Sequence, residues 1–271
     1  MHVLAYAVAA ALYLAASIRY ALRFAQGRRG TTALVAVLVY TGVLSHAAGV
    51  ALYWASYGEP PLVGLGPSLA SLALLVALAL AGLGLFSSAR AVGLILAPAA
   101  SLLLLLALLI GIQPTGSEFA FRGPWLVFHV SVSFIGYAGW LVAAAAALMY
   151  LLQFRALKHK HLGAIFEFFP PLETLDRLSE WALVIGFSAL TLGIAVGWAW
   201  TIRFEQGLRW GDPKVIWGVL AWLALLLALW ARFSRRRSTR QAALWNVAGF
   251  AVVSVAYLVA KLTIAEARFF L

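Results

Sequence analysis

The chain has 271 residues, of which 64% are hydrophobic and 11% are charged. Soluble domains carry about 25% charged residues, so this composition excludes a water-soluble protein and indicates a polytopic membrane protein. The absence of cysteine excludes disulfides, thiolate metal sites and thiol redox chemistry, and the net charge of +11 follows membrane topology, so nucleic acid is not an expected partner.

Eight apolar stretches recur along the chain, each long enough to cross roughly 30 Å of hydrocarbon as a helix. They are 2–24, 31–54, 61–86, 90–112, 125–153, 181–203, 214–233 and 241–262. The first lacks the basic start and small-residue cleavage site of a signal peptide, so we expect it to remain as a helix. The pattern predicts an all-α helical bundle of about eight transmembrane helices that forms a single domain over residues 1–271.

Two of these stretches contain a histidine, and an ionisable residue at membrane depth is a functional hypothesis. On span 31–54, Gly42, Gly49 and Tyr53 share the face of His46. Small neighbours would leave a groove beside the ring for a planar ligand, although they also serve tight helix packing.

On span 125–153, Ser133, Gly136, Tyr137 and Trp140 share the face of His129. His46 and His129 lie roughly 12 Å and 6 Å below the same membrane boundary at helical rise. Because both depths fall in one half of the bilayer, we expect the two rings to face one another.

The segment between spans five and six, from Arg155 to Glu180, contains Pro170 and Pro171. Proline stops one structure and suits the first turn of the next, so we expect residues 172–180 to lie on the membrane surface before span 181–203. Within that span, Gly186, Gly193 and Gly197 form a small-residue row that indicates helix packing.

The loop region 198–222 concentrates aromatic and charged residues. It contains Trp198, Trp200, Trp210, Asp212, Lys214, Trp217 and Trp222. Tryptophan is enriched at membrane interfaces, but this constellation also suits a platform for a flat, partly apolar, anionic ligand.

Basic residues predict the orientation of the bundle. The connections after spans one, three, five and seven hold 13 of the 20 Lys and Arg residues, the opposite side holds six, and Arg19 lies within span one. The basic side is expected in the cytoplasm, which places both termini and the tryptophan-rich loop outside a bacterial or archaeal type of inner membrane.

Asp212-Pro213-Lys214, followed by Trp217 and Trp222, resembles the core of the tryptophan-rich WWD segment of cytochrome c assembly proteins of the CcsA type and their HemX-like relatives. FHVSVSFIGYAGW in span five and PPLETLDRL are similar to the same family. The resemblance covers a core of about 125–262, whereas 1–124 is matched less. Gly211 stands in place of the family's Trp, and no histidine follows His161 to match the family's second outer histidine.

The resemblance implies non-covalent, b-type haem as a cofactor and His129 as an axial iron ligand. His46 is the expected partner because it is the other intramembrane histidine and lies at a similar depth. Trp198, Trp200, Trp210 and Trp217 would pack the porphyrin, while Asp212 and Lys214 would fix the shape of the loop. Tyr137 lies on the face of His129. Lys261 is placed where it could meet a haem propionate, although snorkelling to the interface also explains it.

The leading hypothesis is a non-catalytic, haem-binding membrane protein of cytochrome c assembly. Its partners would be the lipid bilayer, haem, and an assembly partner or apocytochrome. One alternative is a regulator of haem biosynthesis, or a transport-type protein, without bound haem. Another is a subunit of an enzyme that forms the thioether bonds of cytochrome c.

Overall fold

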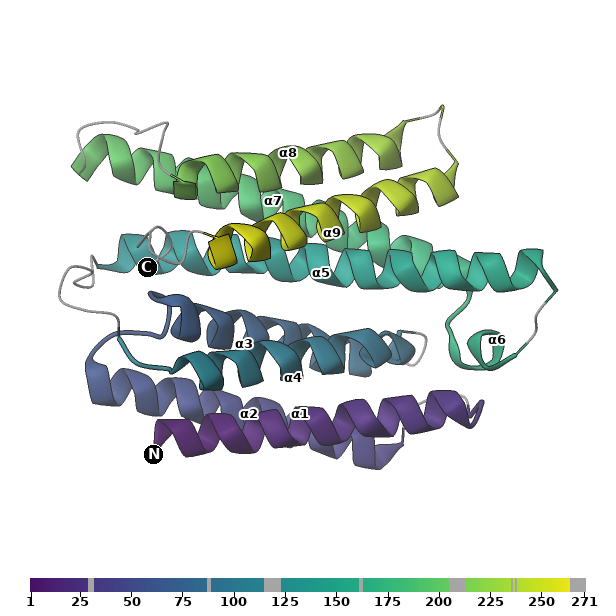
Figure 1. The fold of residues 1–271 in the computed structure, drawn as a ribbon, viewed down its shortest axis with the longest axis horizontal. Coiled ribbons are helices and arrows are strands. Elements are labelled where there is room, and N and C mark those ends of the chain that lie inside the picture. Colours follow the sequence, from purple (N-terminus) through teal and green to yellow (C-terminus); the bar gives the residue numbers. More distant parts are fainter. Residues whose placement is uncertain are drawn as a thin grey trace.

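The computed structural model describes residues 1–28, 32–86, 89–114, 123–160, 163–204, 213–234, 236 and 238–263. Its elements are α1 (His2–Ala25), α2 (Ala33–Tyr57), α3 (Leu65–Gly84), the 3₁₀ turn η1 (Arg90–Val92), α4 (Gly93–Ile110), α5 (Pro124–Lys158), α6 (Ala164–Phe168), α7 (Leu172–Phe204), α8 (Pro213–Phe233) and α9 (Thr239–Thr263). The long helices run roughly along one direction (Figure 1). The predicted all-α class is therefore confirmed.

Seven helices in the described part of the chain are long and apolar enough to cross a membrane: α1, α2, α3, α4 with η1, α5, α7 and α8. The eighth predicted span, 241–262, coincides with α9, which is not among those seven. Its first turn carries Thr239, Arg240 and Gln241, and these residues make the start of α9 polar. The chain is a polytopic membrane helical bundle.

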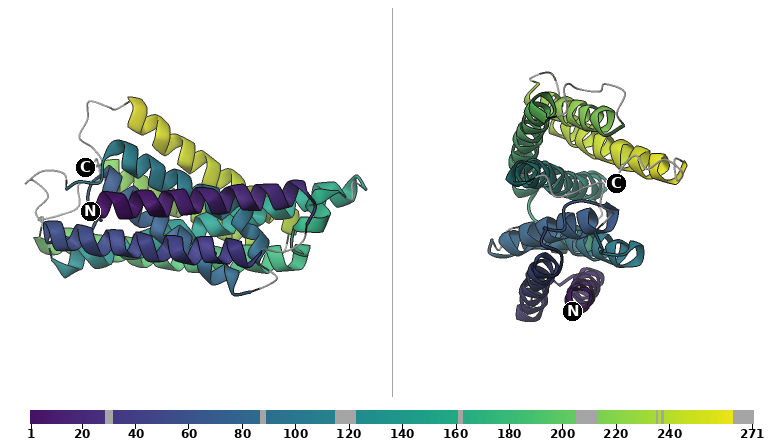
Figure 2. Two further views of the ribbon diagram at one scale, coloured as in Figure 1. Left: turned by 90° about the horizontal axis from the view of Figure 1, so that it is seen from below. Right: turned by 90° about the vertical axis from the view of Figure 1, so that its left-hand side faces the viewer.

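The helices stack in layers, which the end-on view in Figure 2 shows. Helices α1 and α2 form one layer, and α1 packs on α4 of the next layer, where α3 and α4 pair. Helix α3 contacts α5, which packs along α7. Helix α8 lies on α7, and α9 lies on both α8 and α5.

The contact between α5 and α7 brings two backbones together. A Cβ added at Gly139 would lie 3.0 Å from the Gly186 Cα, and one added at Gly186 would lie 3.1 Å from the Trp140 nitrogen. A Cβ added at Gly136 would lie 2.9 Å from the backbone nitrogen of Leu190. These glycines permit an approach that other residues would prevent, which confirms helix packing as the role of the glycine row on α7.

The expected surface segment at residues 172–180 is not separate, because these residues form the first turns of α7, a helix of 33 residues. The break occurs earlier, at Pro170 and Pro171, and no proline interrupts the helix afterwards. A helix of that length spans about 50 Å, which exceeds the hydrocarbon thickness. Helix α7 can therefore extend beyond the membrane without a bend.

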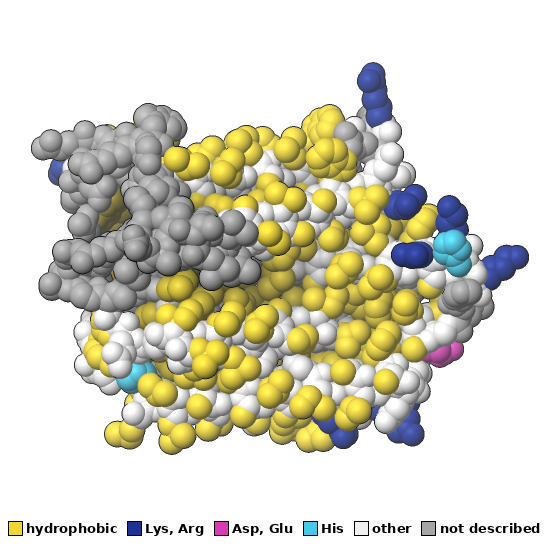
Figure 3. Space-filling model, viewed as in Figure 1, with side chains coloured by type: hydrophobic (Ala, Val, Ile, Leu, Met, Phe, Trp, Pro, Cys, Tyr) yellow, Lys and Arg dark blue, Asp and Glu magenta, His cyan; other side chains and the backbone are white. Residues whose placement is uncertain are grey.

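The two ends of the bundle differ in charge. The N-terminus lies at one end, and Figure 3 shows most of the visible Lys and Arg side chains at the opposite end. We call this the basic end. It includes the last turn of α5, with Arg155 and Lys158, and the first turn of α9, with Arg240.

A polar network near the basic end links four helices. The Trp140 indole of α5 donates to the Asn246 side-chain oxygen of α9 at 3.0 Å, and the Asn246 amide donates to the Ser179 hydroxyl of α7 at 3.2 Å. Arg232 of α8 binds both oxygens of Asp176 and one oxygen of Glu180 on α7. Side-chain hydrogen bonds thus hold α8 and α9 against the central pair.

We predict that Gly186→Val lowers the stability of the bundle, since the new side chain would collide with the backbone of α5. Overpacking of this kind costs about 1–3 kcal/mol. Thermal unfolding in detergent measures the effect. Gly82→Ala on α3 is the matched control, because a Cβ there meets nothing within 4 Å and alanine favours the helix by roughly 1 kcal/mol. Equal melting temperatures for the two variants would contradict the close approach of α5 and α7.

Candidate functional site

His129 lies in the second turn of α5 and packs against α7. Its Nδ1 is 2.7 Å from the carbonyl oxygen of Gly193. A carbonyl can only accept, so Nδ1 carries a proton and donates it, and in the neutral ring this contact selects the tautomer with its lone pair on Nε2. This is the form of histidine that binds a metal, with its second nitrogen fixed by an outer partner.

Glycines of α7 create the space that the His129 ring occupies. A Cβ added at Gly197 would lie 2.6 Å from the Cε1 atom of His129, and one added at Gly193 would lie 2.4 Å from the Ser133 hydroxyl. The imidazole therefore lies directly on the α7 backbone. Ser133 donates its hydroxyl to the His129 carbonyl at 2.8 Å, which keeps that side chain on the same face of α5.

His46 has a different environment, because it is fully buried on α2. Its Nδ1 is 3.3 Å from the Tyr13 hydroxyl, and its ring meets Tyr6 edge-on with centroids 5.4 Å apart. The predicted groove beside His46 is filled. Tyr13 packs on Gly42 and Tyr6 on Gly49, with ring atoms 2.6 Å and 3.0 Å from the positions of added Cβ atoms.

The two intramembrane histidines are not brought together. Helix α2 packs against α1 and α3, whereas α5 packs against α7, α9 and α3, and the layer of α3 and α4 lies between them (Figure 2). The expectation that His46 and His129 face one another does not fit this arrangement. That expectation was based on the depth of each histidine along its helix, and the depth does not determine which helices are neighbours in the bundle.

The N-terminal helices hold a cluster that the sequence analysis missed. His2 lies against Tyr53 and Tyr57, with ring centroids 5.7 Å and 5.4 Å apart. The His2 Nε2, Tyr6 hydroxyl and His46 Nε2 atoms are buried without a hydrogen-bond partner in the described residues. The spacing of Tyr6, Tyr13 and Tyr20 by seven residues is a signal that could have placed them on one buried face.

The tryptophans in the described part of the loop region differ in exposure. Trp198 of α7 is exposed, Trp200 is partly buried, and Trp217 of α8 packs against Tyr257 of α9 with ring centroids 5.2 Å apart. Trp222 donates its indole N–H to the Thr191 hydroxyl at 2.9 Å. It therefore joins α8 to α7 and has a structural role.

Of the remaining predicted site residues, the structure describes the side chain of Tyr137. Tyr137 is partly buried against the core of the bundle. Trp210 and Asp212, as well as the side chains of Lys214 and Lys261, lie outside the described residues.

The start of α5, the end of α7 and the start of α8 share one end of the bundle (Figure 1). That end therefore carries His129, Trp198 and Trp217. Among the described residues, no group of three or more His, Asp or Glu could hold a metal ion.

Comparison with known proteins gives one family and several relatives. A family model described as Cytochrome C assembly protein matches residues 65–265. The chain is similar to the protein named "Cytochrome c biogenesis protein CcsA" of Guillardia theta, with 33% identity over 155 residues, or 51% of each chain. It is 32% identical over 159 residues to the protein of that name from Prochlorococcus marinus (strain MIT 9515), again over 51% of each chain. For Chlamydomonas reinhardtii, identity is 32% over 140 residues, or 51% of this chain and 38% of the relative. The chain thus spans about half the length, or less, of these relatives.

We predict that Tyr13→Phe destabilises the N-terminal helix pair. The substitution removes the hydroxyl that bonds the His46 Nδ1 atom, and loss of such a bond costs about 1 kcal/mol. The melting temperature in detergent should fall, whereas Tyr57→Phe, on a side chain that is 40% exposed, should leave it unchanged. Equal behaviour of the two variants would show that the Tyr13 contact does not stabilise the fold.

Proposed function

This chain belongs to the cytochrome c assembly protein family, and we propose that it binds non-covalent haem in its membrane domain during cytochrome c assembly. His129 would hold the haem iron through Nε2. The observation that carries the proposal is the 2.7 Å contact between His129 Nδ1 and the Gly193 carbonyl, because it fixes the tautomer that leaves Nε2 able to bind iron.

The family match supports this assignment. The matched region, 65–265, includes both His129 and the tryptophan-rich segment. Imidazole suits iron, and the protein tunes the metal through axial ligation and burial. When bound, haem would supply the iron centre, while the chain positions His129 and shields it from water.

The residues around the loop have supporting roles in the proposal. Trp198, Trp200, Trp210 and Trp217 offer aromatic surface to the porphyrin, and Tyr137 extends the face of His129. Asp212 and Lys214 would fix the shape of the loop, and Lys261 would meet a propionate. Partial burial of Trp217 against Tyr257 gives that ring a fixed position, which suits a packing surface for a planar ligand.

The separation of the histidine layers changes the expected coordination. His46 belongs to the layer of α1 and α2, so we no longer propose it as the second ligand. His129 would then be the one imidazole of this chain that holds the haem iron, and a partner protein, an apocytochrome or water would complete its coordination.

The charge distribution supports an orientation with the basic end in the cytoplasm. The tryptophan-rich segment and both termini then face the outer compartment of a cytoplasmic-type membrane, where apocytochrome would receive haem. This arrangement favours haem handling over regulation of haem synthesis, since the proposed ligand faces away from the cytoplasm.

We predict that the full-length protein, purified with haem supplied, shows a Soret band that depends on His129. His129→Ala should abolish the band. Gly197→Ala should lower haem affinity about tenfold or more, because the added Cβ would displace the ring from its outer hydrogen-bond partner. His46→Ala is the matched control and should keep the spectrum of the native protein.

Absorbance spectra and haem titrations measure these effects. A native preparation that stays colourless would reject haem binding and favour a regulator or a transport-type protein. Loss of the band in His46→Ala alone would place the haem in the N-terminal layer. Formation of thioether bonds on a CxxCH peptide would instead identify a synthetase subunit.

We also predict the topology of the chain. A reporter fused after Arg240 should behave as cytoplasmic, and a reporter fused after Leu271 should behave as external. Reporter activity in intact cells shows on which side of the membrane each fusion lies. If both reporters were on the same side, α9 would not cross the membrane. If the reporter after Arg240 were external, the proposed outer position of the tryptophan-rich segment would lose its support, since α8 separates the two.

A further inference from the structure

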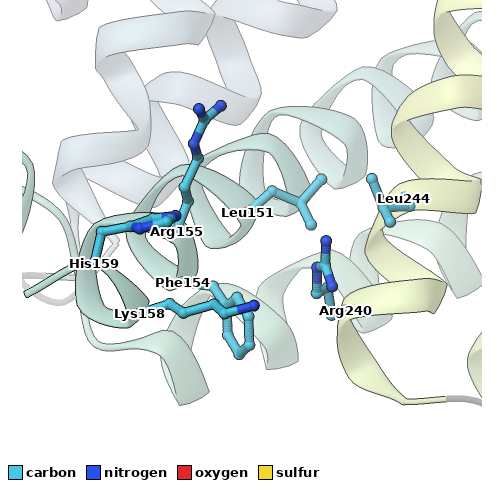
Figure 4. A pocket seen from close by; sticks show the side chains of 7 residues that line it. All are labelled: Leu151, Phe154, Arg155, Lys158, His159, Arg240 and Leu244. Atoms are coloured by element: carbon cyan, nitrogen blue, oxygen red, sulfur yellow. The ribbon is translucent and has the colours of Figure 1, made fainter.

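A groove opens between α5 and α9 at the basic end, far from the start of α5 where His129 lies. Its volume is about 370 Å³. The nitrogen-bearing side chains that line it are Arg155, Lys158, His159 and Arg240. Figure 4 shows that α9 supplies Arg240 and Leu244, whereas the other labelled side chains come from α5 and from His159, the residue that follows it.

The groove combines positive charge with an apolar wall. Leu151, Phe154 and Leu244 line it beside the basic residues, and no acidic residue does. Within the described residues, the carboxylates with a described cation partner are Glu173, Asp176 and Glu180, which pair with Arg177 and Arg232, and none of them reaches Arg155, Lys158 or Arg240. Three cations that no described carboxylate neutralises, beside an apolar surface, predict an anionic ligand with an apolar part.

The groove is also held in shape. The Arg240 guanidinium carbon lies 5.8 Å from the centre of the Phe154 ring, a distance at which the cation is attracted to the ring face. The start of α9 is fixed by a reciprocal cap, in which Ser238 and Gln241 exchange hydrogen bonds of 3.1 Å and 3.3 Å. Arg240 is therefore positioned by both helices.

We propose that this groove binds the phosphate headgroup of an anionic phospholipid. Lys158 and Arg240 meet the phosphate, and the acyl chains lie along the exposed apolar faces of α5 and α9. Leu148 and Leu152 continue the face of Arg155 toward the membrane interior, at 37% and 40% exposure. Val252 and Val255 provide a similar exposed surface on α9, at 67% and 59%.

The position of the groove identifies a lipid as the occupant in preference to a free anion. Lys158 ends α5 and Arg240 lies in the first turn of α9, so we expect both charges at the level of the lipid headgroups on the basic side. A soluble phosphate would gain nothing from the leucines and Phe154. This inference does not depend on haem binding, because the groove and His129 lie near opposite ends of α5.

Binding of phosphatidylglycerol to the purified, delipidated full-length protein in detergent tests the proposal. Native mass spectrometry gives the affinity, with phosphatidylcholine as the neutral comparison. Each Lys or Arg near an anionic lipid contributes about 1 kcal/mol, which is about fivefold in affinity. Arg240→Gln should weaken phosphatidylglycerol binding about fivefold, and Lys158→Gln with Arg240→Gln should weaken it about 25-fold.

Arg236→Gln is the matched control, because Arg236 is exposed near the same end but does not line the groove. It should bind phosphatidylglycerol as the native protein does. If the Arg240 variants do not fold, the affinity of Lys158→Gln for phosphatidylglycerol tests the proposal. Melting temperatures measured without lipid show which variants fold.

Three results would overturn the proposal. Equal binding of phosphatidylcholine would show that charge does not select the ligand. Equal weakening in Arg236→Gln would show diffuse attraction in place of a site. Displacement of phosphatidylglycerol by millimolar inorganic phosphate, or by haem, would assign the groove to a free anion or to a tetrapyrrole carboxylate.

Discussion

The close approach of α5 and α7 is the constraint on which the other features depend. Lipid tails are as apolar as leucine, so helices in a bilayer associate through packing and hydrogen bonds and gain little from the hydrophobic effect. Gly136, Gly139 and Gly186 allow the two backbones to touch. The His129 ring reaches the Gly193 carbonyl because this separation is maintained along the helices. The hydrogen bond of the His129 imidazole therefore depends on the glycine contacts between α5 and α7, which lie several residues away.

The polar network transmits this arrangement to α8 and α9. Unsatisfied polar groups are costly in lipid, which makes the Trp140, Asn246 and Ser179 chain a strong determinant of how α9 docks. Arg232 faces two carboxylates, Asp176 and Glu180, and its removal would leave both without a cation. Since these contacts fix one end of α8 and α9, they also determine where Trp217 and Tyr257 meet at the other end.

The sequence predicted the helices well and the layers poorly. Hydropathy finds the spans because a bilayer requires a continuous apolar helix of a given length, and Pro170 with Pro171 correctly marks a break directly before α7. The lateral order of helices depends on side-chain packing, which leaves no period in the sequence. His46 and His129 therefore had similar predicted depths and yet belong to separate layers. Trp210 and Asp212 stay predictions, because they lie outside the described residues.

The division between the layers coincides with the start of the family match. The family match begins at residue 65, the first residue of α3, so α1, α2 and His46 precede it. The matched part contains the α5 and α7 pair with His129, and it contacts the N-terminal pair through α3 and α4. Tyr6 and Tyr13 enclose His46 and occupy the glycine notches of α2. This enclosure explains the buried imidazole as a packing element of the N-terminal layer, so a haem site at His129 requires nothing from it.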